Sequence, residues 1–168
     1  MIKNELNFVE YDKKYAEQCH RNFLGQLETS KYTLWKPTQN VEDAERKLEF
    51  WTSDLKGNDI FWLILDKKNQ AIGFICAGES SPGVFGDIGI AIGKEFLHNG
   101  YGTMALNELL KVIKERDGKE VHYSHFEENE ASKRLAMKFG FEFYKRDVRL
   151  RKYDNKEFNE LFYVLKIK

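Results

Sequence analysis

The stretch Asp87–Leu110 constrains the fold more than any other part of the sequence. It begins with isoleucines that alternate with small residues, which predicts a buried strand, and it then passes through a glycine-containing turn into a helical pattern. Gly100 and Gly102 carry no Cβ, so a ligand can approach the backbone of the turn closely. The unpaired N–H groups and the positive dipole end of a helix N-terminus favour an anion. The stretch therefore predicts a phosphate or pyrophosphate site.

The turn itself narrows the choice of ligand. It reads Leu97-His98-Asn99-Gly100-Tyr101-Gly102, without the third glycine of a dinucleotide fingerprint or the Gly-Lys-Ser/Thr of a P-loop. It resembles motif A of the GCN5-related N-acetyltransferases, the GNAT family, whose pattern is Gln/Arg-x-x-Gly-x-Gly/Ala before a long helix. The strand at Asp87–Ile92 also resembles the fourth strand of the RimJ/RimL-like branch, which acetylates the N-termini of ribosomal proteins. Leu97 departs from the Gln or Arg of the motif.

A second match lies downstream of the first. The stretch from Glu128 resembles motif B of the same branch, Asn-x-x-Ser followed by Gly-Phe, with Asn129, Ser132, Gly140 and Phe141 at the matching positions. Many GNAT enzymes have a tyrosine four residues before this glycine, whereas this chain has Ala136 there. The two motifs occur in the family's order, and with the strands between them they cover about the central third of the chain.

The resemblance implies an acetyl-CoA-dependent N-acetyltransferase. Its acceptor would be a primary amine, such as a protein N-terminus, an amino acid or a small amine, and no covalent enzyme intermediate would form. In the family, strand four separates from strand five, and its backbone holds the coenzyme. Carried onto this sequence, the expected coenzyme-binding residues are Ile90, Ala91, Ile92, His98, Asn99, Gly100, Tyr101, Gly102, Thr103, Asn129 and Ser132.

Acetyl transfer also requires a base, because an alkylammonium has a pKa around 10 and must lose a proton before attack. The candidates, in order of preference, are Asp87, Glu79 and His125. Asp87 is preferred because it alternates with Gly89 and Ala91, which places its carboxylate on a face left open by small residues. A turn role for Asp87 and a packing role for His125 are the alternatives.

The departing thiolate requires a proton or a hydrogen-bond donor. The resemblance suggests Ser132, since Ala136 cannot act as an acid; helix capping by Asn129 and Ser132 is the alternative. Tyr32 and Trp35 are the candidate acceptor-binding residues. They lie in an aromatic, irregular segment that borders the acceptor pocket in the family, and simple packing is the alternative.

The hydrophobic pattern predicts a mixed α/β fold in one GNAT domain, residues 1–168. We expect a mostly antiparallel sheet of six to seven strands, with strands four and five parallel and splayed, and helices on both faces. The predicted strands are 6–11, 60–65, 71–77, 87–92, 120–126, 141–148 and 157–167. The predicted helices are 12–23, 41–56, a long helix after the glycines up to 116–118, and a short motif B helix with Ala131, Leu135 and Phe139 inward. Gly78–Gly86 is predicted to be a loop.

Composition limits the partners. Lysine plus arginine and aspartate plus glutamate number 27 each, so no charge excess indicates nucleic acid or a membrane surface. The hydrophobic fraction of 42% excludes a disordered chain. Cys19 and Cys76 lack metal-ligand spacing and are typical of small buried thiols. We expect a cytoplasmic protein, a monomer or homodimer, without a metal, a signal peptide or a membrane span.

Two other functions remain open. The same residues could form an acyl-CoA-binding sensor or partner module without activity, because Leu97 and Ala136 depart from the family pattern. A nucleotide-binding regulator is the third option. Coenzyme release in the presence of amines separates the first two functions, and competition between ATP and CoA separates the third.

Overall fold

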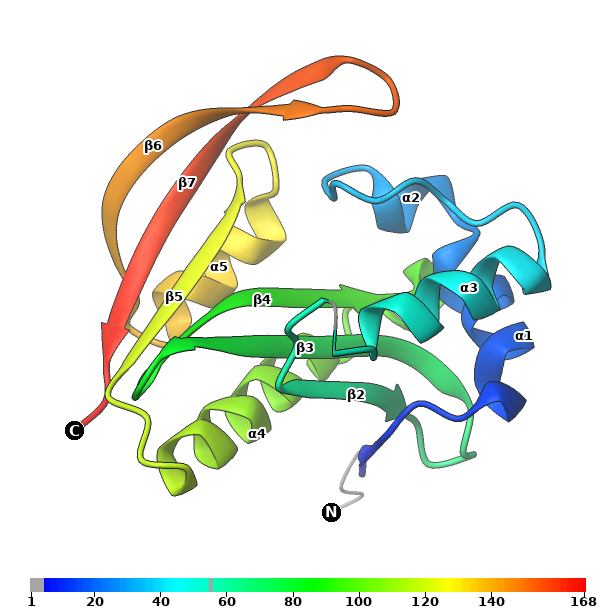
Figure 1. Cartoon of the computed structure of the whole chain (residues 1–168), viewed down its shortest axis with the longest axis horizontal. Helices are drawn as coiled ribbons and strands as arrows, with labels where there is room; N and C mark the ends of the chain where they lie inside the picture. Colours follow the sequence, from blue (N-terminus) through cyan, green and yellow to red (C-terminus); the bar gives the residue numbers. More distant parts are fainter. Residues whose placement is uncertain (1–4, 55) are drawn as a thin grey trace.

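The computed structural model describes residues 5–54 and 56–168. Figure 1 shows a single open sheet wrapped by helices. Its seven strands are β1 (Asn7–Val9), β2 (Ile60–Leu65), β3 (Ala71–Ser81), β4 (Val84–Ile92), β5 (Glu120–Phe126), β6 (Glu142–Arg151) and β7 (Lys156–Lys166). The spatial order is β1-β2-β3-β4-β5-β7-β6, and β4 and β5 are the parallel pair. This confirms the predicted GNAT-type α/β fold.

Helices cover both faces of the sheet. Along β2 the side chains alternate strictly: Ile60 and Ile64 join one apolar cluster, while Phe61 and Leu63 join the other. The first cluster lies under α4 (Tyr101–Glu115) and α5 (Glu130–Lys138). The second lies under α1 (Ala16–Cys19) and α3 (Val41–Trp51). A strand apolar on both faces must be central, as predicted.

The first helix is broken into three pieces. Asp12 accepts from Lys14 N–H at 2.9 Å, which confirms the predicted start. The 3-10 turn η1 (Lys13–Tyr15) is followed by α1 and by the π-helical turn η2 (His20–Leu24). A further short helix, α2 (Leu27–Ser30), lies within the segment predicted to be irregular.

α3 is shorter than predicted. Asn40 is the cap, because its side chain accepts from Asp43 N–H at 2.8 Å. The helix ends at Trp51 instead of continuing to 56, since the hydroxyls of Thr52 and Ser53 donate to the carbonyls of Leu48 and Phe50 and compete with helix continuation. Residue 55, predicted on the same apolar stripe, lies outside the described residues.

The predicted loop at 78–86 is wrong. β3 continues to Ser81 and β4 begins at Val84, so a tight turn at Pro82-Gly83 joins them. Gly83 has φ +78, the left-handed conformation that favours glycine. Of the turn-forming residues in this stretch, only Pro82-Gly83 form the turn, and the others belong to the two strands of a long hairpin.

The remaining elements follow the predictions closely, with one correction on α5. β5 has the predicted bounds, and β6 and β7 form the expected antiparallel pair. On α5, Leu135 and Phe139 pack against the core as predicted, whereas Ala131 is exposed and Ala136 is buried in its place. None of the helices in the described part of the chain is long and apolar enough to cross a membrane.

The feature that positions the site is the divergence of β4 from β5. These strands pair only at Val84 with Glu120 and at Phe85 with Val121. Beyond this point β5 stays with β7, and Figure 1 shows the β5–β7 strands leaning away from β4. The edge of β4 from Gly86 onward therefore faces a gap instead of a neighbouring strand.

Candidate active site

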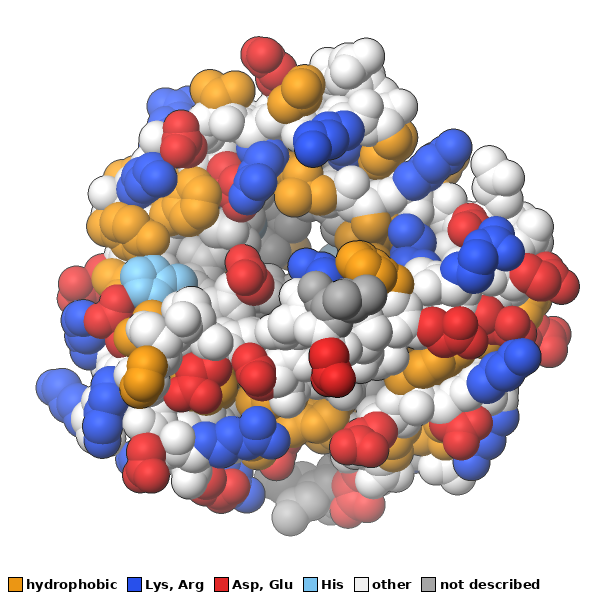
Figure 2. All heavy atoms as spheres, in the orientation of Figure 1, with side chains coloured by type: hydrophobic (Ala, Val, Ile, Leu, Met, Phe, Trp, Pro, Cys, Tyr) orange, Lys and Arg blue, Asp and Glu red, His pale blue; other side chains and the backbone are white. Residues whose placement is uncertain are grey.

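A cavity of about 450 Å³ lies at this divergence. Figure 2 shows the hollow near the centre of one face, with basic and acidic side chains around it. Its lining comes from β3, β4, β5, β6, β7 and the segment after α2. The side chains that line it include Tyr32, Trp35, Trp51, Phe74, Cys76, Asp87, Ile90, Tyr123, Ser124, His125, Asn129, Arg149 and Glu160.

Asp87 occupies a bulge in β4. The register with β3 shifts between Cys76 and Gly78, opposite the stretch between Gly86 and Gly89. Asp87 takes φ +49 there and is exposed to the cavity. The bulge interrupts the alternation on which the prediction relied, but it still presents the carboxylate to the cavity. A non-glycine residue held at positive φ is strained, and such strain occurs often at functional sites.

The backbone of β4 beyond the bulge has an unpaired edge. Gly93 N–H donates to Ile72 O at 2.8 Å, and Ala91 lies opposite Phe74. Because bonded residues alternate along an antiparallel ladder, Ala91 directs its peptide groups to β3, and Ile90 and Ile92 direct theirs to the gap. Of the three predicted residues, Ile90 and Ile92 face the gap with their backbone and Ala91 does not.

The N-terminus of α4 opens beside this edge. Gly100 caps the helix with φ +76 and no side-chain hydrogen bond, and the first α4 bond to a described acceptor is from Met104 N–H to Gly100 O at 3.1 Å. Within the described chain, nothing accepts from the N–H groups of residues 100–103. A Cβ on Gly102 would meet only Ile90 Cδ1, at 3.9 Å. These groups can hold an anion, as predicted from the sequence.

The remaining residues of the turn have local roles. His98 has φ +65, and the Asn99 amide donates to the carbonyls of Phe96 and Leu97 at 3.1 and 3.2 Å. The Asn99 side chain therefore holds the turn that presents the helix N-terminus. Leu97 is exposed.

Hydroxyl groups gather where α5 meets β5. Asn129 lines the cavity and accepts from Ser132 N–H at 3.2 Å, so it caps α5. The Ser132 side chain contacts the buried Tyr123 phenol, which lines the cavity while Ser132 does not. Burial raises the pKa of Tyr123 to about 12, so its phenol stays protonated at neutral pH. Tyr123 is a potential proton donor that sequence reasoning missed.

His125 is held on both ring nitrogens. Nδ1 lies 2.8 Å from Phe126 O, and Nε2 lies 3.0 Å from the Tyr163 hydroxyl. A carbonyl can only accept, so Nδ1 carries the proton and Nε2 accepts from Tyr163. Burial lowers the pKa of His125, which favours this neutral ring. The ring lines the cavity, but neither nitrogen is free to act as a base.

Glu79 and the two cysteines do not contribute a reactive group. Glu79 lies near the β3–β4 turn, where it accepts from Gly83 N–H at 2.9 Å, and it does not line the cavity. We do not retain it as a base. Burial raises the pKa of Cys19 to about 12 and that of Cys76 to about 11. Both are protonated, buried thiols, and the described residues include no cluster of three or more metal ligands.

Both aromatic residues predicted to bind the acceptor, Tyr32 and Trp35, line the cavity. Their segment is tied to the β6–β7 hairpin by Arg151, whose Nη1 donates to the carbonyls of Ser30, Lys31 and Thr33 at 3.4, 3.0 and 3.1 Å. Figure 1 shows α2 facing this hairpin across the opening.

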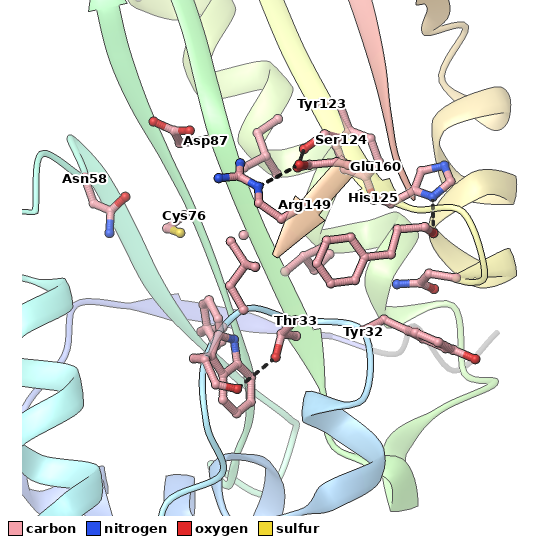
Figure 3. Close-up of a pocket in the computed structure, with 18 of the residues that line it drawn as sticks. Tyr32, Thr33, Asn58, Cys76, Asp87, Tyr123, Ser124, His125, Arg149 and Glu160 are labelled. Carbon is pink, nitrogen blue, oxygen red and sulfur yellow. Dashed lines mark hydrogen bonds and ion pairs between the residues drawn. The ribbon is translucent and has the colours of Figure 1, made fainter. Parts of the chain in front are cut away.

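Sequence reasoning missed a charged group in the cavity, Ser124, Arg149 and Glu160 (Figure 3). The only sign of this group in the sequence is Glu160, which lies on the same face of β7 as the buried Phe158. A carboxylate on a buried strand face requires partners. The sequence does not show which partners, because they come from β5 and β6.

The family model described as an acetyltransferase (GNAT) domain matches residues 5–142. The chain belongs to the GNAT family of acetyltransferases. It is therefore an N-acetyltransferase, as predicted. No curated protein matches the sequence.

Solved GNAT structures share the fold. A GCN5-related N-acetyltransferase from Brucella melitensis has a TM-score of 0.82 and 16% identity over 99% of this chain and 77% of its own. A GNAT-family acetyltransferase from Bacillus anthracis has a TM-score of 0.79 and 19% identity over 98% and 97%. The microcin C7 self immunity acetyltransferase MccE, solved in complex with acetyl-CoA and AMP, has a TM-score of 0.83 and 19% identity over 97% and 93%.

Proposed function

We propose that this GNAT domain transfers an acetyl group from acetyl-CoA directly to a primary amine. The observation that carries the proposal is the unpaired edge of β4, which ends beside the open N-terminus of α4. Such a continuous run of free peptide groups can pair with an amide-containing arm at one end and a pyrophosphate at the other. Coenzyme A has both of these groups, amides in its pantetheine arm and a pyrophosphate.

The coenzyme would be held mainly by backbone. The N–H groups of residues 100–103 would bind the pyrophosphate, and the peptide groups of Ile90 and Ile92 would bond the pantetheine arm and polarise the thioester carbonyl. Leu97 offers no polar side-chain atom, so in this proposal the turn binds by backbone alone. Asn129 supports the proposal from α5, since its amide lines the same cavity.

Asp87 is the proposed base. Its carboxylate would take the proton from the ammonium, directly or through a water, and free the nitrogen lone pair. The nitrogen then forms a bond to the thioester carbon as the carbon–sulfur bond breaks, and the electron pair leaves on sulfur. Cys76 lies in the cavity as a protonated thiol, which supports transfer without a covalent enzyme intermediate.

Tyr123 is the proposed donor to the leaving sulfur, and Ser132 is proposed to act through it. The Tyr123 phenol remains protonated and faces the cavity, while Ser132 contacts it from α5. The phenol would donate to the departing thiolate, and Ser132 would hold the phenol in place. The nitrogen loses its second proton as the amide forms, which restores the phenol, and Asp87 passes the first proton to solvent.

The acceptor class is open within this proposal. The RimJ/RimL-like features, the strand at Asp87–Ile92 and the pair Asn129 and Ser132, support a protein N-terminus. We also propose a cytoplasmic location, which fits two free, buried thiols. An inactive acyl-CoA-binding module is the second candidate, favoured by Leu97 and by Ala136, which is buried and has no acid to offer.

Two measurements test the proposal. Calorimetric titration with acetyl-CoA should give a dissociation constant in the micromolar range, and a panel of primary amines should accelerate release of free CoA thiol. Absence of acetyl-CoA binding would contradict both candidates. Binding without thiol release by any amine would favour the inactive module.

A further inference from the structure

The side of the cavity opposite Asp87 has a guanidinium that acetyl transfer itself does not require. Arg149 comes from β6 and lines the cavity. Figure 3 shows the Arg149 side chain reaching toward the strands that carry Asp87, on β4, and Cys76, on β3. An arginine inside a substrate cavity raises the question of which anion it binds.

The partners of Arg149 leave most of its donors free. Arg149 Nε donates to Glu160 Oε2 at 2.9 Å, and Ser124 Oγ donates to Glu160 Oε1, also at 2.9 Å. Both carboxylate oxygens of Glu160 are therefore engaged. Nη1 and Nη2 of Arg149 have no acceptor among the residues that the structure describes. Four of the five guanidinium N–H groups remain for a ligand.

Glu160 also fixes the direction of the guanidinium. The Glu160 side chain is only 9% exposed, whereas that of Arg149 is 47% exposed. A buried carboxylate thus holds the inner nitrogen, and the outer edge is left accessible. Because an arginine restrained in this way loses little further freedom on binding, it is suited to a planar carboxylate, which it can bind through two parallel hydrogen bonds.

The opposite charge lies across the cavity. Asp87 on β4 is exposed to the cavity and forms no ion pair within the described chain. A ligand that places an ammonium at Asp87 and a carboxylate at Arg149 satisfies both groups. The ammonium would then already be at the proposed base.

The third wall is apolar and aromatic. Trp35 and Trp51 meet edge to face at 5.8 Å, and Trp51 packs on Phe74 with ring centroids 5.1 Å apart. All three residues line the cavity. An apolar side chain packed on these rings would be removed from water.

We propose that the acceptor is a free α-amino acid with an apolar side chain, with its carboxylate bound by Arg149. The inference rests on the proposed acetyltransferase function and narrows its substrate. The size of the cavity favours a small acceptor, because about 450 Å³ must also hold the acetyl end of the coenzyme. In a peptide, each further residue moves the C-terminal carboxylate up to about 3.5 Å away from the reacting amine.

Matched acceptors test this assignment. Leucine, leucinol and leucylglycine share the amine and the side chain, and only leucine has a carboxylate next to the amine. We expect kcat/KM for leucine to exceed that for the other two by about 10- to 100-fold, the effect of one charge-assisted contact. Arg149→Met should remove this preference, so that kcat/KM for leucine falls to the level of leucinol. Wild-type affinity for acetyl-CoA and an unchanged circular dichroism spectrum show that the variant is folded.

Arg146→Met is the matched control. Arg146 lies on the same strand, pairs with Glu127 at 2.7 Å and does not line the cavity. This variant should keep the preference for leucine. If the wild-type enzyme acetylates leucinol or leucylglycine as well as leucine, or if Arg149→Met keeps the preference, the inference is wrong and the acetyltransferase function stands. If no amine is acetylated, both are wrong.

Discussion

The two sides of the cavity are built from different parts of the chain. The proposed coenzyme side consists of peptide groups on β4 and at the start of α4, which lie within one continuous stretch of sequence. The proposed acceptor side consists of side chains from the segment after α2, from β5 and from the β6–β7 hairpin. The comparison teaches that backbone groups from one local stretch and side chains from distant strands can form the two sides of one cavity.

If the two sides are separate, the largest loss of activity is expected from a substitution of Asp87. Asp87→Asn removes the proposed base and should lower kcat/KM by about 10²- to 10⁴-fold, the usual contribution of general base catalysis. The dissociation constant of acetyl-CoA should stay the same, because the Asp87 side chain projects into the cavity and is not among the peptide groups proposed to bind the coenzyme. Glu79→Gln is the control, since Glu79 lies outside the cavity, and it should retain activity. Equal losses in both variants would contradict the assignment.

The next largest effect is expected on the coenzyme side. Gly102→Glu places a negative charge at the proposed pyrophosphate site and should weaken acetyl-CoA binding by about 100-fold or more, measured by titration calorimetry. Asn107→Glu adds the same charge at an exposed position on the same helix and should bind acetyl-CoA normally. Normal binding by Gly102→Glu would locate the phosphate site elsewhere.

A substitution of Arg151 tests whether the acceptor side can be destabilised without a change in coenzyme binding. Arg151→Met removes donors from the carbonyls of Ser30, Lys31 and Thr33 and the partner of Asp154, whose pKa the Arg151 guanidinium lowers. We expect a loss of about 2 to 3 kcal/mol in the free energy of unfolding by urea, and a higher KM for the acceptor.

The affinity of Arg151→Met for acetyl-CoA should not change, and Arg146→Met on the same strand should show a smaller loss of stability. A parallel loss of acetyl-CoA affinity in Arg151→Met would show that the two sides are not independent.

The smallest effect concerns His125 and pH. Burial lowers its pKa in the folded state, so below the unfolded value near 6.5 the unfolded chain binds more protons and stability falls. The contribution is complete above pH 6.5 and is lost as pH falls from there toward the lower folded pKa. His125→Asn should therefore flatten the fall in unfolding free energy between pH 7.5 and 5. An unchanged slope would show that the ring is not held neutral.

The difference between the two sides also explains what could be predicted from the sequence. Gly100 and Gly102 lie between β4 and α4 within one short stretch of sequence, so local periodicity and turn chemistry predicted the open helix N-terminus after the strand. Arg149 and Glu160 meet only because β6 and β7 pair, and Ser124 joins them only because β5 pairs with β7. No local pattern encodes these contacts.

The errors have similar causes. Asp87 lines the cavity, but the argument that placed it there was incomplete, because a bulge in β4 cannot be read from alternation alone. The hairpin at Pro82-Gly83 was predicted as a longer loop because glycine and serine are frequent on both sides of it. His125 was predicted as a candidate base because the sequence does not show that Tyr163, on β7, forms a hydrogen bond with its Nε2.

A crystal structure with bound acetyl-CoA tests the central claim most directly. We predict the pantetheine arm between β4 and β5, bonded to the peptide groups of Ile90 and Ile92, with the pyrophosphate at the N–H groups of residues 100–103. A structure in which β4 and β5 close into a continuous ladder and the coenzyme binds elsewhere would contradict the account.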